Sequence, residues 1–312
     1  MSDIKIFSGS ASETLARDIC DSLGIKLGAS RTIVFSEGNI YVKIDEKVRG
    51  EDVYIVQTIG LDPNNELVEL LFWIDAFKRS GVNSVTAIVP YFSYAKADKK
   101  DEPRVSIRAR VCADCLETAG VDRVVTMDLH SPQVQGFFRK PVDHLYAEGL
   151  FCDHIRSMNY SDPVIVSPDE GFAKNARRYS ERLRVPLAIG NKQRPNHDEK
   201  AEILGMLGEV KGKTAIIVDD FTISCGTLSE IAKLLDEKGA KEIIAYVSHS
   251  LLSDKGAAKL EESKISRFYT TDSVCNPAAL RSDKITVLTI AELFAKAIRK
   301  IHEKESLSEL FK

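Results

Sequence analysis

One pattern, a helical stretch followed by a glycine and an apolar strand, occurs three times along the chain and constrains its fold more than any other feature. The three copies begin at Leu70, Ala109 and Leu228. A buried strand that closely follows a helix is typical of a βα unit, and several such units build a parallel sheet. The pattern therefore predicts an α/β fold, in which ligands bind beyond the carboxyl ends of the strands.

The second half of the chain shows the same alternation. Apolar strands occur in PVIVSPDEG, VPLAIGNKQRP and TAIIVDDFT, and the tail contains a strand and a long amphipathic helix. The 312 residues are enough for two domains. We therefore expect two similar α/β domains, at residues 1–146 and 147–312, with about ten residues at the carboxyl end packing back on the first domain.

The composition excludes several classes of protein. The formal net charge is -3, so no overall basic field favours nucleic acid. No apolar run approaches the roughly 18 residues that span a bilayer, and the amino terminus MSDIKIFSGS lacks the features of a signal peptide. The 6 cysteines show no disulfide framework, which is typical of a reducing compartment. We expect a cytoplasmic protein that binds neither nucleic acid nor membrane.

The stretch TAIIVDDFTISCGTL, from Thr214 to Leu228, places polar side chains where a buried strand ends and a helix begins. Asp219 and Asp220 follow the apolar strand expected at 214–218. N–H groups of a glycine-bearing loop and of a helix N-terminus bind anions, while carboxylates accept hydrogen bonds from hydroxyl groups. The stretch predicts a sugar-phosphate site, although an ordinary turn with an acidic helix cap is the alternative.

Two further stretches carry candidate chemistry. Asp128 and His130 lie two residues apart at the end of the apolar strand in VVTMDLHS. Strand periodicity would put both on one face, where they could hold a divalent metal or a polyphosphate; a satisfied polar strand end is the alternative. The charge-rich stretch between residues 91 and 110 is either a solvated loop or a mobile lid that neutralises phosphate.

Several of these stretches resemble one family. VDDFTISCGTL resembles the ribose-5-phosphate loop of type I phosphoribosyltransferases and of ribose-phosphate pyrophosphokinases. MDLHSPQVQGFF and PVDHLYA resemble a pyrophosphokinase signature that phosphoribosyltransferases lack. YAxxDKKD, FSEGN, SPDEGFAK and the K-x-R-P pattern in AIGNKQRP are similar to further family motifs and occur in family order. The resemblance implies two tandem type I phosphoribosyltransferase-like domains, each a mostly parallel sheet flanked by helices.

The resemblance also implies a reaction and a set of site residues. A ribose-phosphate pyrophosphokinase transfers the β,γ-diphosphoryl group of ATP to the anomeric hydroxyl of ribose 5-phosphate and releases AMP. The implied catalytic residues are Lys192, Arg194 and His130. The implied ribose-5-phosphate-binding residues are Asp219, Asp220, Ser224, Cys225, Gly226 and Thr227. The implied ATP-binding residues are Phe35, Glu37, Asn39, Lys96, Lys99 and Asp101. The implied Mg²⁺ ligands are His130, Asp169 and Asp128, and the implied assembly is a dimer-based homo-oligomer, a hexamer in most of the family.

The chain departs from the family pattern at several positions, including Lys96, where an arginine is usual, the order of acid and amide in FSEGN, and the following three. Ile223 stands where an acid is usual, Ala97 where a glutamine is usual and Phe172 where a glycine is usual. These departures suit an alternative, a catalytically weak paralogue that binds and regulates an active synthase. Against that alternative, the implied catalytic cations and acids are all present. A second alternative, a phosphoribosyltransferase that uses the sugar loop alone, leaves the MDLHSPQVQGFF stretch without a role.

Overall fold

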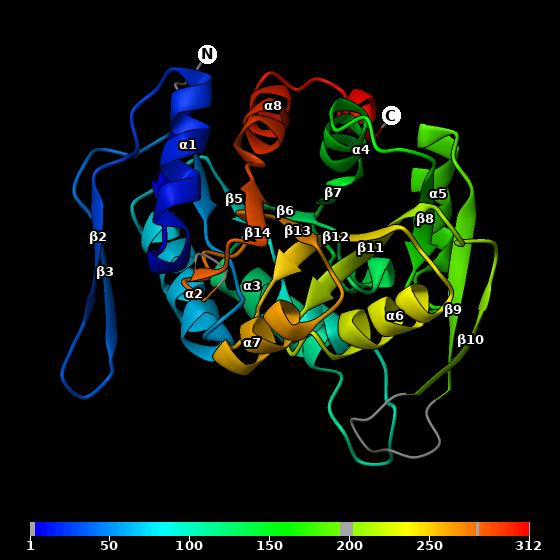
Figure 1. Cartoon of the computed structure of the whole chain (residues 1–312). Coiled ribbons are helices and arrows are strands. Elements are labelled where there is room, and N and C mark those ends of the chain that lie inside the picture. Colours follow the sequence, from blue (N-terminus) through cyan, green and yellow to red (C-terminus); the bar gives the residue numbers. More distant parts are fainter. Residues whose placement is uncertain (1–3, 194–201, 279–280, 312) are drawn as a thin grey trace. The chain divides into compact units, whose positions relative to one another are not determined.

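The computed structural model describes residues 4–193, 202–278 and 281–311. The chain divides into two compact units, each an α/β structure of its own (Figure 1). The first unit comprises Met1–Tyr146, Ser273–Cys275 and Thr289–Lys312, and the second comprises Ala147–Asp272 and Asn276–Leu288. Residues near the carboxyl end of the chain therefore complete the first unit.

The first unit is built on a parallel sheet of five strands in the order β1-β4-β5-β6-β7. The strands are β1 Lys5–Ser8, β4 Asp52–Val56, β5 Ser84–Val89, β6 Arg123–Met127 and β7 Val142–Leu145. The helices are α1 Glu13–Leu23, α2 Pro63–Arg79, α3 Arg108–Ala119 and α8 Ala291–His302, and the 3₁₀ turns are η1 Ser10–Ser12, η2 Ser93–Lys96, η3 Pro132–Phe137 and η5 Ser308–Phe311. The last α-helix of the chain, α8, packs against the first, α1.

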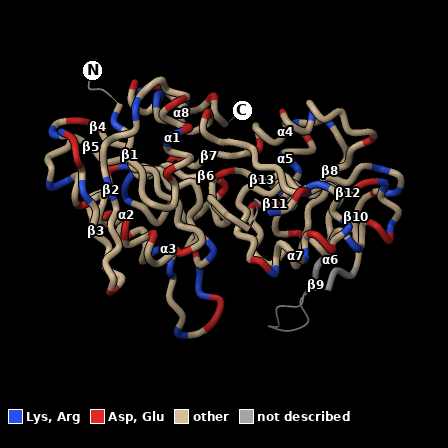
Figure 2. Tube along the Cα trace, turned by 60° about the vertical axis from the view of Figure 1, so that its left-hand side comes forward, with Lys and Arg blue, Asp and Glu red and all other residues tan. Residues whose placement is uncertain are grey.

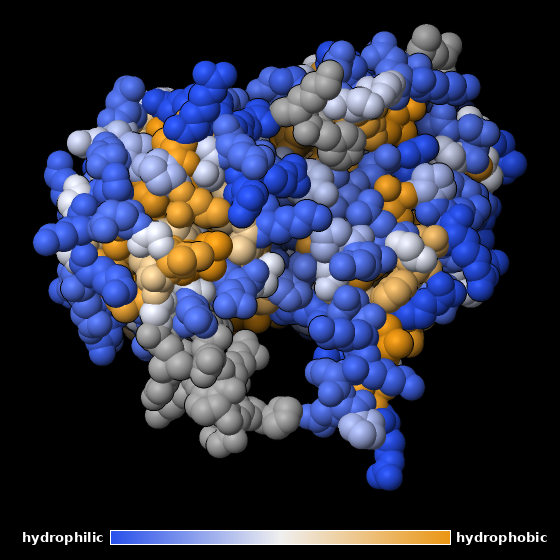
Figure 3. All heavy atoms as spheres, turned by 90° about the vertical axis from the view of Figure 1, so that its right-hand side faces the viewer, coloured by the Kyte–Doolittle hydropathy of each residue, from blue (hydrophilic) through white to orange (hydrophobic). Residues whose placement is uncertain are grey.

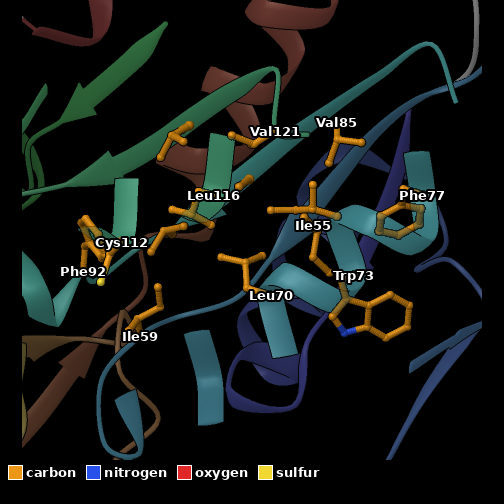
Figure 4. Packing of buried hydrophobic residues seen from close by; sticks show 14 of the residues in the cluster. Ile55, Ile59, Leu70, Trp73, Phe77, Val85, Phe92, Cys112, Leu116 and Val121 are labelled. Atoms are coloured by element: carbon orange, nitrogen blue, oxygen red, sulfur yellow. The ribbon is translucent and has the colours of Figure 1, made fainter. Parts of the chain in front are cut away.

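The core of the first unit lies between the sheet and the helices α2 and α3 (Figure 4). Leu70, Trp73 and Phe77 recur at the three- and four-residue spacing that places side chains on one face of a helix, and all three are fully buried. Ile55 and Val85 belong to the same cluster from the sheet (Figure 4). Burial of each such side chain contributes roughly 1.5–3 kcal/mol. The spacing along α2 thus decides which of its faces covers the sheet.

An antiparallel hairpin of β2 (Ser30–Val34) and β3 (Ile40–Ile44) stands away from the sheet of the first unit (Figure 1). Glu69 of α2, which is 2% exposed, contacts the hairpin at Thr32, in the middle of β2. The Glu69 carboxylate accepts hydrogen bonds from Thr32 Oγ1 at 2.6 Å, Ser10 N at 2.9 Å, Gln57 Nε2 at 3.0 Å and Trp73 Nε1 at 3.2 Å. A buried carboxylate needs such donors because its removal from water is costly.

The second unit is built on a sheet of seven strands in the order β10-β9-β8-β11-β12-β13-β14. All neighbours are parallel except the antiparallel pair β9 and β10. The strands are β8 Pro163–Ser167, β9 Leu187–Gln193, β10 Glu202–Leu207, β11 Thr214–Thr222, β12 Glu242–Ser250, β13 Arg267–Thr271 and β14 Ile285–Leu288. The helices are α4 Glu148–Ser157, α5 Ala173–Leu183, α6 Gly226–Glu237 and α7 Asp254–Glu262.

Two mainly parallel sheets flanked by helices confirm the α/β fold predicted from the repeated pattern. The predicted end of one strand was wrong. We expected the strand before the acidic pair to span 214–218, but β11 continues to Thr222. The extension exists because pairing with β12 continues through Asp219, Phe221 and Thr222. Both carboxylates of the pair are therefore strand residues rather than loop residues.

Acidic and basic residues are interspersed along the backbone of each unit (Figure 2). The loop at residues 97–107, between η2 and α3, extends from the first unit and carries both signs of charge (Figure 2). Figure 3 looks onto the side that carries β9 and β10, where hydrophobic residues form separate patches among hydrophilic ones. Within the described ranges, no helix is both long enough and apolar enough to cross a membrane.

Candidate functional site

Two neighbouring carboxylates occupy the carboxyl end of β11. The backbone that follows each one holds it in place: Asp219 Oδ1 accepts a hydrogen bond from Asp220 N at 3.0 Å, and Asp220 Oδ1 accepts one from Phe221 N at 2.9 Å. Asp220 is only 7% exposed. Fixed carboxylates at the carboxyl edge of a parallel sheet are placed to accept hydrogen bonds from a ligand bound there.

Burial raises the pKa of the Asp219 carboxyl well above its ordinary value, and the negative charges of Asp220 and Asp169 raise it further. The ionised form of Asp219 is therefore destabilised until a hydroxyl donor or a cation reaches it. The influence of Asp169 has a simple origin, since Asp169 follows β8, and β8 is paired with β11. The ends of two adjacent strands thus bring three carboxylates into one electrostatic environment.

The chain after β11 turns directly into the N-terminus of α6. Cys225 is fully buried and has a left-handed backbone conformation, with φ 56°, which is uncommon for a residue other than glycine. Gly226, the first residue of α6, donates its N–H to Ser224 Oγ at 3.4 Å. N–H groups in the first turn of a helix lack intrahelical acceptors and attract anions. The structure therefore gathers Ser224, Cys225, Gly226 and Thr227 at one helix N-terminus.

α7 supports this turn through a glycine that no motif indicated. A Cβ added at Gly256 would lie 2.5 Å from the backbone oxygen of Ile223 and 3.3 Å from the carbonyl carbon of Ser224. Any larger residue would push the helix and the turn apart. The only sequence signal for this contact is a glycine inside an otherwise helical pattern. Gly256 therefore sets how closely α7 approaches the turn.

The loop after β8 holds Asp169 at the start of α5. Ser167 Oγ donates a hydrogen bond to Asp169 O at 2.7 Å, and Phe172 N donates one to Asp169 Oδ1 at 3.1 Å. Phe172, which replaces the usual glycine, has φ -90°, a conformation open to any residue. This replacement therefore requires no strained backbone.

Asp128 and His130 lie beyond the end of β6, so the strand alternation that placed them on one face does not apply. Asp128 has φ 40°, and its N–H donates to Leu145 O at 3.0 Å. The intervening Leu129 N–H donates to His144 Nε2 at 2.8 Å. His144 therefore fixes the turn that carries both residues. Sequence reasoning missed His144, although it lies in the PVDHLYA stretch.

The residues predicted to bind the nucleotide base lie at the tip of the β2–β3 hairpin. Phe35 is 48% exposed, and its ring lies 6.2 Å from that of Tyr41. The turn is closed by Phe35 N–H donating to Asn39 O at 2.8 Å and by Gly38, whose φ of 89° favours glycine. Glu37 and Asn39 are exposed. The tip thus presents an aromatic ring and two polar side chains to its surroundings.

The predicted phosphate-binding stretch begins where η2 ends. Lys96 closes this turn, while Lys99 and Asp101 are exposed on the loop that follows. Ala97 is 8% exposed, and its carbonyl accepts a hydrogen bond from Ala109 N at 3.2 Å. A small apolar residue suits this buried position. The structure therefore accommodates Ala97, one of the departures from the family pattern.

Of the two predicted catalytic cations, the structure describes only the backbone of one. Lys192 belongs to β9, where its backbone pairs with Ile203 of β10. Arg194 lies outside the described residues. Within the described ranges, no group of three or more His, Cys, Asp or Glu residues forms a preformed metal cage.

The parallel sheets, with an acidic strand end directly before the N-terminus of α6, are typical of one class, the type I phosphoribosyltransferase-like proteins. Residues 4–120 match a family described as the N-terminal domain of ribose phosphate pyrophosphokinase, and residues 194–312 match a phosphoribosyl synthetase-associated domain. The ribose-phosphate pyrophosphokinase of Caldanaerobacter subterraneus subsp. tengcongensis is 44% identical over 309 residues, which cover 99% of this chain and 98% of the relative. That of Bacillus caldolyticus is 40% identical over 308 residues, with the same coverage.

A solved structure agrees with these sequence relatives. The crystal structure of phosphoribosylpyrophosphate synthetase from Mycobacterium smegmatis superposes with a TM-score of 0.90 and 38% identity, over 97% of this chain and 100% of that one. The chain belongs to the ribose-phosphate pyrophosphokinase family. The family predicted from the motifs is thereby confirmed, and a phosphoribosyltransferase that uses the sugar loop alone is set aside.

Proposed function

We propose that the chain binds ATP and ribose 5-phosphate and joins the β-phosphorus of ATP to the anomeric oxygen of the sugar, with release of AMP. The observation that supports this most is the arrangement at the end of β11. Asp219 and Asp220 precede the N-terminus of α6 by only a few residues. One short segment therefore offers acceptors for hydroxyl groups and donors for a phosphate.

On the sugar side, we assign the ribose hydroxyls to Asp219 and Asp220. The 5-phosphate is assigned to the turn of Ser224, Cys225, Gly226 and Thr227. A hydroxyl donor near Asp219 would also relieve the destabilisation of its ionised form. Diphosphoryl transfer requires orientation and charge neutralisation more than covalent help from the protein. Holding the sugar at both ends orients its anomeric hydroxyl for in-line attack.

We propose Mg²⁺ as the cofactor, with Asp128, His130 and Asp169 as the residues that serve it. Mg²⁺ prefers oxygen ligands and is commonly bound by one or two carboxylates together with substrate phosphates and waters. The carboxylates around Asp169 fit that donor set, and such a site needs no preformed cage. Bound Mg²⁺ supplies neutralisation of the negative charge on the phosphates. Asp169 is presented for this task by its hydrogen bonds to the loop after β8.

On the nucleotide side, the proposal assigns the base to Phe35, Glu37 and Asn39, and the phosphates to Lys96 and Lys99. Asp101 is assigned to the same site. An exposed aromatic ring beside polar side chains suits an adenine ring, whose face stacks and whose edge forms hydrogen bonds. Lys192 and Arg194 are assigned to the charge that develops on the transferred group.

The test is a nucleotide assay with purified protein, ATP, Mg²⁺ and ribose 5-phosphate that separates AMP from ADP. We expect sugar-dependent AMP and no ADP. Lys192→Ala should lower kcat on the order of a hundredfold, because one transition-state donor contributes about 3 kcal/mol. ADP as the product would refute the assigned reaction. Absence of turnover with ATP, GTP and CTP would favour the regulatory paralogue.

A matched pair of variants tests the sugar site. Asp220→Asn should weaken ribose 5-phosphate binding, measured by calorimetry, about tenfold, since a hydrogen bond to a charged group contributes roughly 1.5 kcal/mol or more. Asp236→Asn changes an exposed α6 carboxylate that pairs with Lys264 and should leave binding unchanged. Equal binding by both variants would contradict the assignment.

We also propose a dimer-based homo-oligomer, a hexamer by the family pattern, which light scattering at several protein concentrations would test.

A further inference from the structure

A lysine of α7 reaches the turn at the start of α6. Gly256 lets α7 approach the turn closely, and Lys259 lies three residues further along the same helix. Residues three apart share a helix face. Lys259 Nζ accordingly lies 3.8 Å from the position that a Cβ on Gly226 would occupy, and Ser224 Oγ lies 3.3 Å from that position. The lysine is half-buried, so its ammonium group is held beside the first residue of α6.

The charge of Lys259 acts on Cys225, which lies in this turn. Burial raises the pKa of the Cys225 thiol to about 11, and the positive charges of Lys259 and Lys284 oppose that rise. Lys284 is engaged elsewhere, since its Nζ donates to Glu261 O at 2.7 Å and to Ser263 O at 3.2 Å at the end of α7. In the part of the chain that the structure describes, Lys259 forms no ion pair.

We infer that Lys259 binds the 5-phosphate of the sugar and makes the site selective for phosphorylated over unphosphorylated ribose. The inference rests on the proposed function, because it assigns a further residue to the same ribose-5-phosphate site. A phosphate at the first turn of α6 would accept hydrogen bonds from N–H groups, and the Lys259 ammonium would add a full positive charge next to it.

The arrangement of charge along the segment explains why this site needs a cation. Asp219 and Asp220 precede the turn by only a few residues, and in their ionised forms they repel a phosphate dianion. The partial charge of a helix N-terminus is only about half an elementary charge. Lys259 strengthens the positive end, so the segment becomes negative toward the hydroxyl groups and positive toward the phosphate. That polarity favours one orientation of the sugar phosphate over its reverse.

The first experiment measures the dissociation constant and KM for ribose 5-phosphate in Lys259→Met, Lys259→Arg and Lys233→Met. Lys233 lies on α6, seven residues beyond Gly226 or about 10 Å along the helix axis, and serves as the matched control. We expect Lys259→Met to weaken binding and raise KM about tenfold, with kcat within about twofold of the parent value. Lys259→Arg should recover most of the loss, and Lys233→Met should match the parent. Unchanged binding in Lys259→Met would overturn the inference.

The ratio of kcat/KM for ribose 5-phosphate to kcat/KM for ribose is a readout that a general loss of stability would not change. With ribose as the acceptor, Lys259→Met and the parent should have equal kcat/KM, because ribose has no 5-phosphate to contact. A parallel loss for ribose and ribose 5-phosphate would show that Lys259 acts only on the structure of the turn. If the parent makes no AMP, the proposed function fails. If the parent is active and Lys259→Met binds and uses ribose 5-phosphate as the parent does, only the inference about Lys259 fails.

A second measurement uses the unmodified protein and so does not depend on the folding of a variant. Lysine acetylation by acetic anhydride, followed by mass spectrometry of the peptides, reports the accessibility of each amine. Ribose 5-phosphate should slow acetylation of Lys259 at least fivefold and leave that of Lys233 unchanged, whereas ribose should protect neither. Equal acetylation of Lys259 with and without saturating ribose 5-phosphate would contradict the inference even if the enzyme is active.

Discussion

Gly256→Ala tests whether the close approach of α7 positions the sugar-phosphate turn. The added Cβ would lie 2.5 Å from Ile223 O, whereas a carbon and an oxygen in close contact are separated by about 3.3 Å. The turn or the helix must therefore move by about 0.8 Å. Overpacking costs about 1–3 kcal/mol, and the preference of helices for alanine over glycine offsets about 1 kcal/mol of that cost. The expected loss of stability is therefore modest, roughly 0–2 kcal/mol.

The loss of activity should be much larger than the loss of stability. A displacement of about 1 Å in a binding group reduces catalysis by up to about a hundredfold, so we expect kcat/KM for ribose 5-phosphate to fall between tenfold and a hundredfold. Steady-state AMP formation and urea unfolding measure the two quantities on one preparation. Gly149→Ala, at a helical glycine whose added Cβ meets only the end of the Arg182 side chain at 3.4 Å, is the control. A stable Gly256→Ala variant with parental kcat/KM would refute the reasoning.

Three further predictions concern buried polar groups. Glu69→Gln should lower the free energy of unfolding, measured by urea denaturation, by about 2 kcal/mol, because the amide nitrogen would face donors. The matched change Asp75→Asn, at a half-exposed carboxylate of α2 that pairs with Arg79, should change it by under about 0.5 kcal/mol. Because the pKa of Asp219 is raised in the folded protein, the ligand-free protein should lose stability as pH rises above about 4. Asp219→Asn should flatten that decline in urea midpoints measured between about pH 4 and pH 8, and parallel profiles would contradict the cause. Iodoacetamide at about pH 8 should label exposed Cys275 far faster than buried Cys225, as mass spectrometry would show.

The parts of the fold that follow from local periodicity could be predicted from the sequence. The helical pattern that begins at Leu70 indicated α2, and the apolar run before Asp219 indicated the buried part of β11. The end of β11 could not be predicted in the same way. It depends on pairing with β12, whose residues lie about thirty positions further along the chain.

The same distinction between local pattern and distant contact applies to the residues of the candidate site. Residues within one contiguous motif, such as the turn from Ser224 to Thr227, could be assigned because a strand, a glycine-bearing turn and a helix start follow one another in sequence. Gly256 and His144 could not be assigned, since each acts by contact with a segment distant in sequence. The same-face argument for Asp128 failed because a left-handed residue interrupts the strand geometry. Sequence periodicity describes regular backbone, and site residues often lie where that regularity ends.

The packing of α8 on α1 has a consequence for the order in which the protein matures. Because Thr289–Lys312 belongs to the first unit, synthesis must finish before that unit has all of its parts. While the ribosome makes the second unit, the face of α1 that α8 later covers is without its partner, and buried residues of α8 such as Phe294 and Ile298 do not yet exist. The amino-terminal unit therefore remains incompletely covered while about 140 residues are synthesised, at about 5–20 residues per second. A chaperone that shields α1 during those seconds would protect the nascent chain more effectively than one that acts after release.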